Sequence, residues 1–182
     1  MALTVTKVVG LPDEIYSLTP SELALRNQQA LAGMGVSDEV TRRFLSNEAL
    51  SITLRCSIVR SLKALGTLRG SAAIVEVAAN CDTRRQVEFL DQALILLAKQ
   101  QQSGKATYSS LEVVGRLPGA INSAGVLEIS APVDYLSWTP EVAGFAQRDD
   151  LLGRKPILLL GGGASERTRA ELKALGWSVV TP

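Results

Sequence analysis

The segment ILLLGGGASERTRAELKALGWSVV, residues 157–180, decides how the C-terminal part of the chain folds. Its opening apolar run is typical of a strand buried on both faces, and the glycines that follow favour a turn. Ser165 can cap a helix that we expect to reach Leu175, with Gly176 as its terminator. Residues 177–180 then return as a strand. A strand–helix–strand unit of this kind predicts two parallel strands.

The residues just before this segment indicate a small sheet. Turn-forming residues 122–125 separate the apolar runs 119–121 and 126–129, which predicts a hairpin with Gly125 at positive φ. Residues 133–138 read as extended, and Thr139-Pro140-Glu141 starts a helix that we expect to end near Gln147. For residues 108–115, a strand and a short helix both fit the pattern.

The first half of the chain predicts successive amphipathic helices, because capping residues precede apolar stripes of helical spacing. Two capping boxes stand out, at Thr19–Glu22 and Thr83–Gln86. The expected caps of the helices are Thr19, Ser37, Ser51, Ser71 and Thr83. Short connections between about five helices favour a HEAT-like or orthogonal bundle.

These patterns together predict an α+β fold. The polar run from Gln100 to Lys105 is the best linker candidate. We therefore expect a helical subdomain over residues 1–104 and a small mixed α/β subdomain over residues 105–182, ending in the strand–helix–strand unit. Tight packing of the two parts into one compact domain is the alternative.

The composition excludes several classes of function. The chain has 182 residues, with 19 Lys and Arg against 18 Asp and Glu, a net charge of +1 and no histidine. Histidine-based triads and histidine-ligated zinc are therefore impossible within it. The near-neutral charge offers no electrostatic footprint for nucleic acid. Two cysteines are too few for a cysteine-only zinc site or a disulfide framework.

No apolar run is long enough to span a membrane, and residues 1–7 lack the pattern of a signal peptide. A soluble, cytoplasmic protein is therefore the default expectation. The abrupt start and end of the sequence also fit a domain of a longer, exported protein. The compartment decides whether Cys56 and Cys81 are buried thiols or form a disulfide between helices.

The glycine turn is the sharpest candidate site. Gly161, Gly162 and Gly163 lead from a strand into a helix that begins at Ser165, where backbone N–H groups can hold phosphate or carboxylate. Glu166 stands where a dinucleotide fingerprint needs another glycine, and no Lys-Ser/Thr pair follows. The structural interpretation, a tight strand-to-helix turn, is therefore favoured.

A second candidate is a polar pocket formed by Asp134, Tyr135 and Trp138. Alternation along a strand places Asp134 and Trp138 on one face and Tyr135 on the other, which favours core packing of Trp138 instead. The same alternation argues against a hydrolase built on Asp134 with Tyr135 or Ser137. Asp149 and Asp150 are expected to be solvated rather than to bind a cation.

The sequence favours a non-enzymatic interaction or structural domain. We expect it to be part of a larger protein, and to bind a protein partner or another region of the parent chain. No cofactor, metal site or catalytic residue is indicated. The basic pairs Arg42-Arg43 and Arg84-Arg85 hint at a surface that faces a partner, although solvated helix faces are the favoured explanation. The alternative is a small-ligand or anion-binding domain that uses the glycine turn.

Overall fold

The computed structural model describes residues 17–66 and 68–181. Our expectation about residues 1–7 lies outside this part of the chain. In the described part no helix combines the length and the apolar character that crossing a membrane requires.

Helices make up the first half of the fold. They are α2 (Pro20–Gly33), α3 (Asp38–Ser46), α4 (Ile52–Ala64), α5 (Ser71–Ala79) and α6 (Arg84–Gln102). The predicted caps Thr19, Ser37, Ser51 and Thr83 each accept a hydrogen bond from the first turn, and both capping boxes form. These helices start where predicted because a cap is a local interaction between residues three positions apart.

The predicted cap at Ser71 is wrong by one residue. Gly70 caps α5 with φ at 96°, and the Ser71 hydroxyl instead donates to the Leu68 carbonyl oxygen over 2.8 Å. Residue 70 is a glycine because a Cβ there would overlap the Leu111 carbonyl oxygen of the neighbouring strand. Only glycine fits this position, and the sequence pattern does not reveal the contact.

The second half forms a five-stranded mixed sheet of order β1-β2-β3-β5-β7. Its strands are β1 (Tyr108–Val114), β2 (Leu117–Asn122), β3 (Leu127–Ala131), β5 (Ile157–Leu160) and β7 (Ser178–Val180). β1, β2 and β3 pair antiparallel, whereas β5 lies parallel to both β3 and β7. The predicted hairpin and the predicted parallel pair are confirmed, and residues 108–114 form a strand rather than a helix.

Smaller elements complete the C-terminal part. β4 (Tyr135–Leu136) pairs parallel with β6 (Gly163–Ala164) in a separate two-stranded sheet. Two helices follow the predicted caps, α7 (Pro140–Ala146) after Thr139 and α8 (Glu166–Ala174) after Ser165. The molecule is therefore a mixed α+β fold, as predicted.

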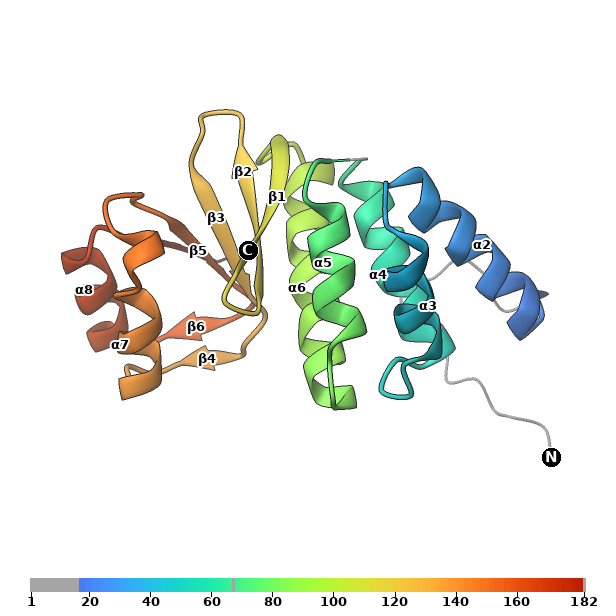
Figure 1. The fold of residues 1–182 in the computed structure, drawn as a ribbon. Helices are drawn as coiled ribbons and strands as arrows, with labels where there is room; N and C mark the ends of the chain where they lie inside the picture. The colour runs from blue at the N-terminus through green and yellow to red at the C-terminus, as the bar shows by residue number, and fades with distance from the viewer. Residues whose placement is uncertain (1–16, 67, 182) are drawn as a thin grey trace.

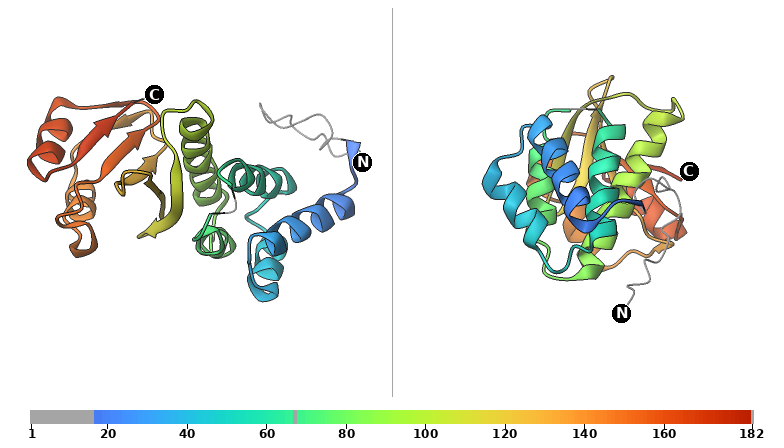
Figure 2. Two further views of the ribbon diagram at one scale, coloured as in Figure 1. Left: turned by 90° about the horizontal axis from the view of Figure 1, so that it is seen from above. Right: turned by 90° about the vertical axis from the view of Figure 1, so that its right-hand side faces the viewer.

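The sheet has helices on both faces, and each face has its own core. Leu111, Ala120 and Leu159 join the core formed with helices α2–α6, whereas Leu127 and Leu158 join the core on the α7 and α8 side. Figure 1 shows this order of layers, with the sheet between α6 and the α7–α8 pair. Seen from above in Figure 2, the layers follow one another along the long axis of the molecule.

Candidate functional site

Backbone N–H groups of the glycine turn already donate hydrogen bonds to carbonyl oxygens of neighbouring segments. The Gly163 amide donates to the Asp134 carbonyl oxygen over 2.8 Å, and the Ser165 amide donates to that of Leu136 over 3.0 Å. The Gly161 amide donates to the Ala131 carbonyl oxygen over 3.0 Å. An anion at the turn would need these same N–H groups, so the hydrogen bonds remove donors on which the anion-site prediction depends.

Close packing explains why glycine stands in the middle of this turn. A Cβ on Gly162 would overlap the carbonyl group of Asp134, which directly precedes β4, the strand that pairs with β6. The glycines therefore let two backbone segments approach each other, which favours the structural interpretation of the turn.

The residues of the predicted polar pocket, Asp134, Tyr135 and Trp138, lie in different surroundings. The Asp134 side chain is exposed, and that of Tyr135, on β4, is 62% exposed. Trp138 is half-buried and packs against the core beside α7 and α8. β4 covers only Tyr135 and Leu136, a shorter strand than the extended segment expected over residues 133–138, so strand alternation does not decide where Asp134 and Trp138 lie.

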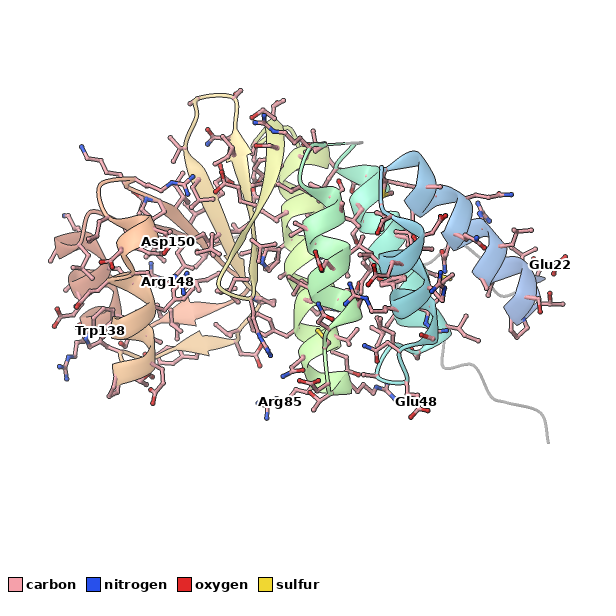
Figure 3. All side chains as sticks on the ribbon, in the orientation of Figure 1. Glu22, Glu48, Arg85, Trp138, Arg148 and Asp150 are labelled. Atoms are coloured by element: carbon pink, nitrogen blue, oxygen red, sulfur yellow. The ribbon has the colours of Figure 1, made fainter. Side chains whose placement is uncertain are left out.

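Asp150, Cys56 and Cys81, which the sequence analysis also considered, are engaged in an ion pair or buried in the core. Asp150 accepts two hydrogen bonds from Arg148, of 2.9 and 3.0 Å, and Figure 3 shows the two side chains next to each other. Cys56 on α4 and Cys81 after α5 are both buried free thiols. Among the described residues, no group of three or more Asp, Glu, Cys or His side chains could hold a metal ion.

Two buried carboxyl groups are part of the packing between elements. Glu128 on β3 accepts hydrogen bonds from the Tyr108 hydroxyl (2.7 Å) and the Asn122 amide (2.9 Å). Burial, together with this contact to Glu128, raises the pKa of Tyr108. Burial also raises the pKa of Asp91 on α6 to about 6, although a hydrogen bond with Ser57 opposes the rise. Neither carboxyl group lines a cavity described below.

A cleft of about 510 Å³ lies between α5, the N-terminal end of α6 and the β1–β2 turn. Its apolar lining includes Val77, Phe89, Leu90 and Leu117. The volume falls in the range of small-molecule pockets, and a mostly apolar lining is typical of them. Sequence reasoning missed this cleft because the chain positions that form it meet only in the folded protein.

The charged side chains of the cleft lie at its rim. Arg85 and Arg116 are exposed, and neither has an ion-pair partner among the described residues. Figure 3 shows Arg85 extending from the lower end of α6. Among the described residues that line the cleft, Glu76 is the one carboxylate, and its Oε1 lies 3.4 Å from Nη2 of Arg43. The rim therefore carries two unpaired positive charges and one compensated negative charge.

A second pocket, of about 220 Å³, lies beneath α7 on the other face of the sheet. Its walls include Val142, Phe145 and Trp177, and Glu141 is the one charged side chain among the described residues that line it. Phe89 and Leu117 line both this inner pocket and the cleft, so the two cavities adjoin.

Comparisons with protein-family models, with curated proteins and with solved structures found no match. The geometry of the chain itself therefore carries the functional argument. One sequence signal did point toward the cleft, since Arg85 belongs to a basic pair noted as a hint of a partner surface. Its neighbour Arg84 is instead paired with Glu88 over 2.7 Å and lies outside the cleft.

Proposed function

We propose that this chain is a non-enzymatic binding domain and that the cleft beside α6 is its binding site. The observation that most strongly supports this proposal is an apolar cleft of about 510 Å³ with two unpaired arginines at its rim. Apolar walls supply binding free energy by removing surface from water, and the few polar groups at the edge supply orientation.

The chemistry of the lining supports a binding role rather than catalysis. Burial raises the pKa of the Cys81 thiol, which disfavours the nucleophilic thiolate. The Thr83 hydroxyl is engaged as the cap of α6, and the Glu76 carboxylate is held by Arg43. These side chains are therefore poorly suited to act as general acids, general bases or nucleophiles.

The partner expected from the sequence, a protein or another region of the parent chain, stays a prediction. Such a partner would place an apolar side chain in the cleft. We further infer that helices α2–α6 form a HEAT-like or orthogonal array, since α4 packs between α2 and α6 while α3 packs against α5. The alternative anion site at the glycine turn has weaker support, because its amides are already hydrogen-bonded.

The proposal is tested by titrating the protein with indole, a neutral apolar probe, and following backbone amide signals by NMR. We expect saturable shifts that centre on Phe89, Leu90 and Leu117. Val77→Trp should abolish them by filling the cleft, since Val77 is half-buried in its wall. Leu25→Trp is the matched control, because Leu25 is 56% exposed on α2, away from the cleft. Shifts that are scattered, or that persist in Val77→Trp, would refute the proposal.

A further inference from the structure

We propose that the cleft selects a small anionic amphiphile, with its acid group at Arg85 and Arg116 and its apolar body against Phe89. This inference rests on the proposed binding function and specifies the ligand class. It follows from the unequal distribution of charge and apolar surface along the two adjoining cavities.

The apolar part of the site continues past the cleft. Phe89 is half-buried and lies between the two cavities, whose shared walls are its ring and Leu117. The inner pocket of about 220 Å³ has walls that are almost wholly apolar, including Val142 and Trp177. Water gains few hydrogen bonds in such a space, so an alkyl or aryl group is the chemistry that fills it best.

The charged part of the site is at the opposite end. Arg85 and Arg116 come from different elements, α6 and the β1–β2 turn, yet both line the cleft. Burial raises the pKa of the Cys81 thiol; the positive charge of Arg116 opposes that rise and the negative charge of Asp82 makes a smaller addition to it, so the guanidinium acts on the cleft wall. Guanidinium groups bind carboxylates through charge-assisted hydrogen bonds, which makes an acid the complementary head group.

The negative charges near the site define the orientation. Glu76 is held by Arg43, which reduces its repulsion of an acid. Glu141 lines the inner pocket, and a hydrogen bond with Thr139 lowers its pKa, so it stays anionic at neutral pH. A carboxylate is therefore repelled from the α7 side and attracted to the α6 side, while the apolar body points toward α7.

The test compares octanoate, octan-1-ol and octylammonium, three probes with the same alkyl chain and different head-group charge, by calorimetry on the full chain. We expect octanoate to bind about tenfold more tightly than the other two, as two exposed charge-assisted contacts would give. Arg85→Gln and Arg116→Gln should each weaken octanoate binding and leave octan-1-ol binding unchanged. Arg84→Gln is the matched control and should change neither.

The alkyl chain is tested separately. Val142→Phe reduces the space in the inner pocket, so it should weaken octanoate binding more than butyrate binding, because octanoate has four more methylene groups to bury. Equal binding of octanoate and octan-1-ol would overturn the anionic selection and leave the cleft as a binding site. Tighter binding of octylammonium would also overturn it. If none of the three probes binds, while indole shifts the cleft signals, only this inference fails. If indole fails as well, the proposed function falls with it.

Discussion

The buried carboxyl group of Asp91 makes the stability of the fold depend on pH. The side chain is 1% exposed, and its Oδ1 has no hydrogen-bond partner among the described residues. Burial raises the pKa of the carboxyl from 3.8 to about 6 on folding. Folding therefore favours the neutral acid, and ionisation costs stability. The contribution of Asp91 to the free energy of unfolding is fully present below pH 3.8. It is lost as the pH rises to about 6 and stays lost above that pH.

Asp91→Asn should therefore stabilise the protein at neutral and alkaline pH. The difference in pKa corresponds to about 3 kcal/mol, so we expect the free energy of unfolding to rise by about 1–3 kcal/mol near pH 8. Near pH 4 the gain should shrink to about a third or less, because the folded wild-type carboxyl is then neutral. Urea denaturation at both pH values measures this. An equal change at both would show that ionisation of Asp91 is not the cause.

Glycines at two positions in the C-terminal part give opposite predictions. Gly162→Ala should destabilise the protein by about 1–3 kcal/mol, since the new methyl group would overlap the Asp134 carbonyl. Gly144→Ala, in α7, should stabilise by about 0.5–1 kcal/mol, because nothing lies within 4 Å of the added carbon. Thermal unfolding of both variants measures the contrast. Similar effects would show that the turn relaxes to admit a side chain.

At the scale of elements, the same threonine cap occurs in two places, with Glu22 completing one capping box and Gln86 the other. Thr19 begins α2, at the outer end of the helical layer, and Thr83 begins α6, which packs on both α4 and the sheet. Loss of either cap should cost about 1 kcal/mol. We expect Thr83→Ala to lower the global free energy of unfolding, and Thr19→Ala to accelerate mainly the hydrogen exchange of α2 amides. Global destabilisation of equal size in both variants would contradict this difference.

The elements that the sequence predicted are those defined by neighbours in the chain. Helix caps, the turn at Gly125 and the parallel pair around α8 each depend on residues a few positions apart or on one short crossover. The pairing of β4 with β6 and the position of Gly70 were not predicted, because each depends on a backbone contact with a distant segment. The cleft was missed for the same reason, since its walls come from α5, α6 and the β1–β2 turn.

At the scale of the whole molecule, the helical layer and the sheet share one core. The buried residues around Leu94 and Leu97 of α6 also include Tyr108, Leu111 and Leu159 from the sheet. A backbone hydrogen bond of 2.8 Å joins the Leu111 amide to the Arg69 carbonyl oxygen, which ties the segment before α5 to β1. From these contacts we propose that the two parts form one compact domain, whereas the division into subdomains at residues 104 and 105 stays a prediction.

A fragment of residues 1–104 should therefore not fold cooperatively. It would expose the face of α6 that the sheet covers, and we expect a broad thermal transition and strong binding of a hydrophobic dye. The full chain should unfold in one sharp transition. Calorimetry of both proteins tests this. A sharp transition for the fragment would show that the helices form an independent domain.

The placement of the two tryptophans has a practical consequence. Trp138 and Trp177 both belong to the core beside α7 and α8, and the ring of Trp177 lies 6.2 Å from that of Phe145. The chain has no other tryptophan. Intrinsic fluorescence thus reports on one side of the sheet alone, whereas far-ultraviolet circular dichroism reports mostly on the helices of the other side. The two signals can therefore be followed during refolding without labelling the protein. A lag between the fluorescence change and the circular dichroism change would reveal which layer assembles first.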